Sequence, residues 1–102
     1  MSNSKTFREL ALSFPGVTES KHFNRTAFKV KKIFATLQEE ANIGMIQLSP
    51  VEQSLYCKID MEVIYPVPGG WGLKGATYID LKKIKKPLLK EIMAIGYKKV
   101  CR

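Results

Sequence analysis

The sequence predicts an α+β fold in which an antiparallel β-sheet packs with about three helices. Apolar residues recur with a helical period near both ends of the chain and with a period of two in much of the middle. The predicted order is helix, strands, helix, strand and helix, which lacks the regular βαβ alternation of parallel-sheet proteins. A chain of 102 residues is long enough to bury one modest core, so we expect a single domain over residues 1–102.

The first predicted element is a helix over residues 4–14. Four apolar side chains share one face at helical spacing: Phe7, Leu10, Ala11 and Phe14. Thr6 followed by Glu9 fits a capping box, and Ser4 is an equally good N-cap. A proline and a glycine follow at once and end the helix, because proline lacks a backbone donor and glycine permits the turn. The apolar face is predicted to belong to the core.

Residues 17–49 carry the two-residue period of an antiparallel meander with three or four strands. Three of these strands are predicted at residues 26–30, 33–38 and 43–48. Residues 17–23 add a further strand in the four-stranded version. Odd- and even-numbered residues of the strand at 33–38 are expected to face opposite sides of the sheet. The connection Lys31–Lys32 has hairpin length, although neither residue suits the positive φ of a primed turn.

A second helix is predicted to begin at Ser49. Serine suits the N-cap, Pro50 suits the first helical position, and Glu52 suits the third, each for a separate physical reason. The helix is expected to run to about residue 59. The side chains expected to face inward are those of Val51, Leu55 and either Tyr56 or Ile59.

The remaining elements are a short extended piece at residues 63–65, a glycine-rich connection, a strand at 76–81 and a last helix that Pro87 opens. The apolar residues of that helix fall within an arc of about 160°, which is wide enough to cover one face of a sheet. They are Leu88, Leu89, Ile92, Met93, Ile95, Gly96 and Val100.

The glycine-rich connection holds the only tryptophan of the chain, Trp71. Ordering such a loop is costly because glycine loses the most backbone freedom on folding, so Trp71 is either held by the core or used in binding. The run Gly70–Gly75 matches G-x-G-x-x-G, but a dinucleotide site needs a strand before this motif and a helix after it. Here a strand follows. We interpret the run as a long turn, with Trp71 folded back as a lid on the core.

Charge favours an anionic partner such as nucleic acid, an acidic protein or an anionic lipid surface. The chain has 17 Lys and Arg residues against 9 Asp and Glu residues, a formal net charge of +8. One cluster precedes the last helix: Lys82, Lys83, Lys85 and Lys86. These lysines oppose the positive end of the helix dipole, whereas free amides there would attract a phosphate. The cluster is therefore either a phosphate clamp or a solvated run of lysines.

Other site chemistries lack the residues that they need. His22 is the only histidine and has no assignable nucleophile, and the spacing of the two cysteines, Cys57 and Cys101, is not that of metal ligands. We expect both thiols to be free, no metal, no cofactor and no enzymatic activity. No apolar run reaches the length of a membrane span and no secretory signal is present, so we expect a cytoplasmic protein with no membrane association. We also expect a monomer.

Four stretches in this order resemble the MmcQ/YjbR family of small bacterial proteins. They are Leu10-Ala-Leu-Ser-Phe-Pro-Gly-Val-Thr-Glu19, Ala27-Phe-Lys-Val30 leading to Ile33-Phe-Ala35, Ser49-Pro-x-Glu-Gln53, and Pro66-x-Pro-Gly-x-Trp-Gly-x-x-Gly-x-Thr77. Asn24 and Thr26 stand where the family pattern has glycine and proline. The resemblance implies an α+β fold with an antiparallel sheet, described as a double-wing DNA-binding-like architecture. It implies no catalytic residues.

Charge and this resemblance together predict a non-enzymatic domain that binds DNA through its phosphates, with weak sequence preference. Lys31 and Lys32 would contact the backbone from one wing and Lys74 from the other, while Trp71 stacks on a base or holds its loop. Lys82, Lys83, Lys85 and Lys86 would extend the patch. One alternative is a protein–protein interaction module that uses the Trp71 loop as a hot spot. Another is a small-molecule site in a cleft between Trp71 and the sheet.

Overall fold

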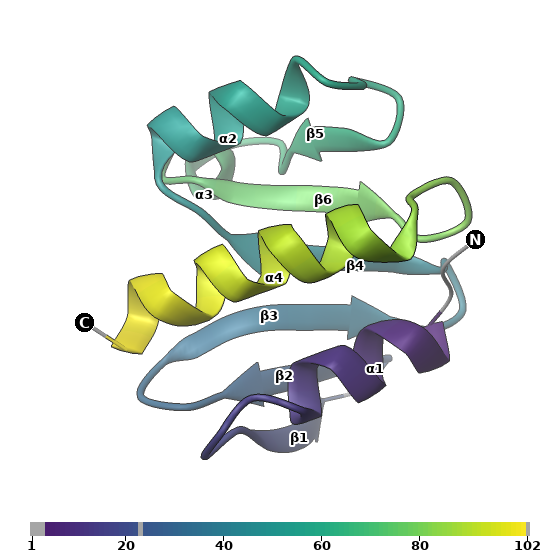
Figure 1. Cartoon of the computed structure of the whole chain (residues 1–102), viewed down its shortest axis with the longest axis vertical. Coiled ribbons are helices and arrows are strands. Elements are labelled where there is room, and N and C mark those ends of the chain that lie inside the picture. Colours follow the sequence, from purple (N-terminus) through teal and green to yellow (C-terminus); the bar gives the residue numbers. More distant parts are fainter. Residues whose placement is uncertain (1–3, 23, 102) are drawn as a thin grey trace.

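Six antiparallel strands form one sheet, and two helices lie across one of its faces (Figure 1). The computed structural model describes residues 4–22 and 24–101. The strands are β1 (Thr18–His22), β2 (Arg25–Lys29), β3 (Ile33–Gln38), β4 (Ile43–Gln47), β5 (Ile64–Pro66) and β6 (Ala76–Asp80). The helices are α1 (Ser4–Leu12), α2 (Pro50–Cys57), α3 (Gly70–Leu73) and α4 (Lys86–Cys101). The predicted α+β class with an antiparallel sheet is confirmed.

The order of strands in the sheet is β1-β2-β3-β4-β6-β5. Strands β1 to β4 are the predicted meander in its four-stranded version, with each strand beside its neighbour in sequence. The chain then leaves the sheet through α2 and returns, so that β6 pairs with β4 on one side and with β5 on the other. Helix α3 is a single helical turn inside the predicted loop, which the sequence pattern did not indicate.

One face of the sheet carries the core. Helices α1 and α4 cover it, and α2 lies beside β5 (Figure 1). The largest fully buried side chains gather on this side: Phe7, Phe28, Phe34, Leu37, Ile46, Leu48, Ile64, Ile79, Leu81, Ile84, Leu89 and Ile92. The apolar faces predicted for the first and last helices therefore point inward as expected.

A β-bulge in the β2–β3 pairing corrects the predicted alternation of residues 33–38. The register shifts between Phe28 and Lys29, so that Phe28 lies opposite Ala35 while Lys29 lies opposite Ile33. Phe34 is the extra residue, and both Phe34 and Ala35 are fully buried. Ile33 is consequently turned to the other face of the sheet and is 44% exposed.

The second helix buries a different face from the one predicted. Its start is as expected, because Ser49 and Glu52 form a complete capping box and Pro50 is the first helical residue. However, Val51 and Leu55 are 69% and 59% exposed, so their prediction as inward-facing residues is wrong. Ile59 is also exposed, while Tyr56, the other half of that alternative, is half-buried.

The residues of α2 that are buried are Gln53 and Cys57. The Gln53 side-chain nitrogen Nε2 donates hydrogen bonds to the backbone oxygens of Gly72 and Ala76, at 3.0 and 2.9 Å. These carbonyls lie where α3 meets the sheet. A buried carbonyl oxygen is stabilised by a hydrogen-bond donor, and an apolar side chain at this position would have none to offer. Gln53 thus attaches α2 to the segment between β5 and β6.

This contact gives a stability prediction. We expect Gln53→Met to lower the free energy of unfolding by about 1–3 kcal/mol, because two hydrogen bonds to buried carbonyls are lost while the volume is kept. Leu55→Gln, on the exposed face of the same helix, is the matched control and should change it by less than about 0.5 kcal/mol. Urea denaturation measures both. A larger loss for Leu55→Gln would show that its side chain is covered.

Candidate functional site

The segment between β5 and β6 is folded tightly against the end of β4. Gly75 has a φ of 110° and its Cα lies against the Leu48 carbonyl, while a Cβ at Gly72 would overlap the carbonyl oxygen of Val67. The Leu48 amide donates to the Gly75 oxygen at 3.0 Å. Two glycines of the G-x-G-x-x-G pattern are therefore required by close backbone approach. This agrees with the interpretation of that motif as a packed turn rather than a phosphate loop.

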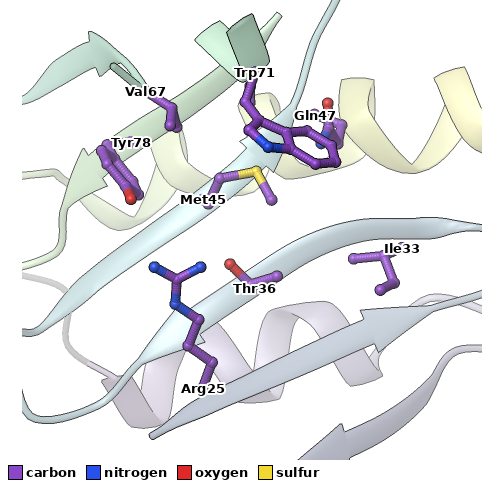
Figure 2. Close-up of a pocket in the computed structure, with 9 residues that line it drawn as sticks. Arg25, Ile33, Thr36, Met45, Gln47, Val67, Trp71 and Tyr78 are labelled. Carbon is purple, nitrogen blue, oxygen red and sulfur yellow. The ribbon is translucent and has the colours of Figure 1, made fainter. Parts of the chain in front are cut away.

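Trp71 sits on α3 and is 69% exposed, so its prediction as a lid on the core is wrong. The core is closed on the helical side of the sheet, whereas Trp71 extends over the opposite side (Figure 2). A large aromatic ring that remains accessible can stack on a planar ligand. Of the two roles considered for Trp71, the structure leaves its ring available for binding.

The face of the sheet opposite α1 and α4, which we call the open face, contains a pocket of about 310 Å³. Cross-strand neighbours bring its floor together, since Met45 lies opposite Thr36 on one side and opposite Tyr78 on the other. Trp71 overhangs this floor (Figure 2). The pocket is lined by Arg25, Ile33, Thr36, Met45, Gln47, Val67, Trp71, Ala76 and Tyr78. It is mostly apolar and lies near the lower end of the size range of small-ligand sites.

Arg25 is the one charged residue that lines the pocket. Its guanidinium points from the start of β2 toward the pocket centre (Figure 2). With the Gln38 amide oxygen turned toward it, Gln38 accepts hydrogen bonds from Nε and Nη2 of Arg25 at 3.3 and 3.2 Å. Across residues 4–22 and 24–101, the only ion pair is that of Arg8 with Glu19. The positive charge of Arg25 therefore has no carboxylate partner within this part of the chain.

The structure brings the predicted wing lysines to one end of the sheet. Strands β3 and β6 both run antiparallel to β4, so the starts of β3 and β6 lie at the same end. Lys31 and Lys32 precede β3, and Lys74 precedes β6. All three side chains are exposed. The last turn of α4, with Lys98 and Lys99, lies at this end as well, and Lys31 Nζ donates to the Cys101 oxygen at 3.5 Å. We call this the wing end.

The second lysine group is not part of that end. Lys82, Lys83, Lys85 and Lys86 lie between β6 and the first turn of α4, and all are exposed. They are separated from the wing end by the length of β6, about 16 Å for five residues. The single continuous patch that the sequence suggested is not formed, because the sheet places its two parts at opposite ends.

Sequence analysis identified Trp71 but missed the other residues of the pocket. In the sequence, Arg25 is one of 17 Lys and Arg residues, and Met45 and Tyr78 fall within the strands predicted at 43–48 and 76–81, so nothing marks these three as site residues. The sequence signal that could have identified them is the alternation of residues along each strand, because an antiparallel register places alternate residues of neighbouring strands on one face. The bulge in β3 interrupts this alternation, so the alternation alone would place Ile33 on the wrong face of the sheet.

Cys57 is a free thiol, and burial raises its pKa, so it is less reactive than an exposed cysteine. Cys101 is free as well. Within residues 4–22 and 24–101, no group of three or more His, Cys, Asp or Glu side chains could hold a metal ion. None of the helices in that same part of the chain has both the length and the apolar character needed to cross a bilayer.

Comparison with known proteins gives a structural relationship. No family model and no curated protein matches the sequence. The fold is similar to the crystal structure of protein DR2400 of Deinococcus radiodurans, which carries the domain DUF419, a domain of the MmcQ/YjbR-like family. The TM-score is 0.87 at 17% sequence identity, over 100% of this chain and 80% of that one. The chain therefore has the fold of an uncharacterised DUF419 domain, which is the α+β fold that the sequence resemblance implied.

Proposed function

We propose that this chain is an MmcQ/YjbR-like domain that binds nucleic acid, DNA in the first place, at the wing end of its sheet. It would act without catalysis, as a monomer in the cytoplasm, and would grip phosphates with weak sequence preference. The observation that supports this most directly is that Lys31 and Lys32 lie at the same end of the sheet as Lys74. One strand, β4, separates the two wings, which puts them roughly 10 Å apart at the strand level.

The distribution of positive charge also supports the wing end as the surface that binds nucleic acid. The formal net charge is +8, and cations from three places converge at the wing end: the β2–β3 turn, Lys74 at the end of α3, and the last turn of α4. Flexible lysine side chains suit phosphate contacts that position a strand without reading its bases. Trp71 lies on α3, and Lys74 is the residue that caps the end of this helix, so the aromatic ring and the wing lysine are carried by one short segment.

The salt dependence of binding tests this proposal. If the three wing lysines each neutralise one phosphate, log K should fall against log salt with a slope of about −2.7 on duplex and about −2.1 on single strands. Substituting Lys31→Gln, Lys32→Gln and Lys74→Gln together should remove most of that slope. Fluorescence anisotropy of a labelled oligonucleotide, from low to moderate salt, measures the slope for each variant.

The chain supplies a matched control. Substituting Lys82→Gln, Lys83→Gln and Lys85→Gln removes the same charge from the opposite end of the sheet. This control should keep the slope within about one unit of the wild-type value, and its stability should be equal or slightly higher because repulsion at the start of α4 is relieved. Equal losses in both variants would mean that only total charge matters. Absence of any binding at low salt would refute nucleic-acid binding.

A protein partner is the second candidate function. Trp71 is 69% exposed, and tryptophan is enriched at interface hot spots. Leu73, on the same helical turn, is 82% exposed and adds apolar surface beside it. Such an interface would respond weakly to salt, because its main contribution is apolar burial rather than counterion release. Leu73→Ser should then abolish partner binding, whereas it should leave phosphate binding unchanged.

A further inference from the structure

The pocket on the open face has aromatic walls and a positive charge of its own, separate from the lysines of the wing end. Two aromatic side chains border it, Trp71 from α3 above and Tyr78 from β6 at the side (Figure 2). Met45 lies between them on the floor. A flat ring that enters this space could stack on the accessible indole while its other face rests on the sheet. Aromatic stacking of a base contributes roughly 1–3 kcal/mol, whatever the base.

The charge inside the pocket favours an anion. The Arg25 guanidinium points into it, has no carboxylate partner in the described chain, and is held in orientation by Gln38 on the neighbouring strand. A guanidinium that already uses Nε and one Nη on an amide still has donors for an incoming oxygen. Arginine suits phosphate because its planar fork donates two parallel hydrogen bonds.

The remaining polar groups suit the edge of a heterocycle. Gln47 offers an amide donor and acceptor, and Thr36 offers a hydroxyl that can do either. A hydrocarbon ligand would leave these groups, and the Arg25 donors that Gln38 does not use, without partners, which is unfavourable once water is displaced. An inorganic anion alone would leave the apolar walls unused. The ligand chemistry that uses every wall is a planar, hydrogen-bonding ring that carries a negative group.

We propose that the open-face pocket binds the base of an unpaired nucleotide, with Trp71 stacking on the base and Arg25 on its phosphate. This inference rests on the proposed nucleic-acid binding and makes it more specific, because a base within a duplex has both faces stacked and cannot enter the pocket. The wing end adjoins the pocket through Ile33, Gln47 and Ala76, which line it at that end. A strand held by the wing lysines would thus deliver a base directly to Trp71.

Trp71 is the only tryptophan, so its fluorescence reports on the pocket without labelling. We would titrate the protein with deoxyadenosine monophosphate, with a ten-nucleotide single strand, and with the duplex of the same sequence. The single strand and the mononucleotide should quench Trp71 emission, the mononucleotide at much higher concentration. The duplex should bind with less than half the quenching of the single strand, because its bases stay paired.

Arg25→Gln and Lys83→Gln form a matched pair, since each removes one positive charge from an exposed side chain. Arg25→Gln should weaken single-strand binding by about tenfold or more, the effect of losing a charge-assisted contact. Lys83→Gln, at the opposite end of the sheet, should weaken it by less than about twofold. Arg25→Lys should recover only part of the loss, because lysine keeps the charge and loses the planar fork.

The outcomes separate the pocket from the wider function. Quenching by the mononucleotide without any strand binding would support the pocket for a free nucleotide and would refute nucleic-acid binding. Strand binding without quenching, and with equal effects of Arg25→Gln and Lys83→Gln, would overturn the pocket proposal while the proposed function stands. If none of the three probes binds at low salt, both proposals fail.

Discussion

Gly75→Ala is expected to lower the free energy of unfolding by about 3–5 kcal/mol, one of the largest effects of any single substitution in this domain. Two costs add at this position. The φ of 110° is a conformation that a residue with a Cβ rarely adopts, and the new methyl group would overlap the Leu48 carbonyl. The nearest atoms are backbone atoms of Leu48 and Ser49, in the connection between β4 and α2, so the strain cannot be relieved by moving a side chain.

Gly70→Ala is the control for this substitution. Gly70 begins α3, five residues before Gly75, its φ is not positive, and nothing lies within 4 Å of where its Cβ would be. Alanine there should leave stability unchanged or raise it by up to about 1 kcal/mol, because it restricts the unfolded chain. Thermal or urea denaturation compares the two variants. If both glycines tolerated alanine equally, the close approach of Gly75 to the Leu48 carbonyl would be wrong.

Phe34→Ala is the second substitution with a large expected effect, and it should lower the free energy of unfolding by about 3–5 kcal/mol. Its ring is fully buried and makes edge contacts with Phe14 and Tyr97, at centroid distances of 6.4 and 5.7 Å. Ile33→Ala, one residue earlier, is the control, because the bulge turns Ile33 to the open face. Ile33→Ala should lower the free energy of unfolding by less than about 1 kcal/mol. Chemical denaturation that gave equal costs at the two positions would contradict the bulge.

Much of the fold could be predicted because local signals agreed with the final packing. The capping box at Ser49, the apolar arc of the last helix and the alternation of the meander all act over a few residues and are satisfied in the structure. Residue patterns failed where a contact distant in sequence decided the outcome. The inward face predicted for α2 was wrong because Gln53 donates hydrogen bonds to carbonyl oxygens that lie 19 and 23 residues further along the chain.

The candidate site was only partly predictable for a related reason. Charge and loop composition pointed to Lys31, Lys32, Lys74 and Trp71, but periodicity cannot show which ends of strands meet. Placing the lysines after β6 at the far end required the register of β4 with its two neighbours. Arg25 became a site residue only once β2 and β3 were paired and the bulge was known. The wing lysines and the pocket are thus properties of the sheet rather than of any one segment.

The insertion of β6 between β4 and β5 has a consequence for how the chain is made. As the protein leaves the ribosome, β1 to β4 can pair in order, but the second edge of β4 has no partner until β6 emerges, and residues 48–75 must emerge before β6 does (Figure 1). At about 5–20 residues per second, that takes about 1–6 s. During this interval Ile43–Gln47 presents an unpaired, largely apolar strand edge, which is a template for pairing with another nascent chain. The nascent chain is therefore most exposed to misassembly just before its fifth and sixth strands arrive.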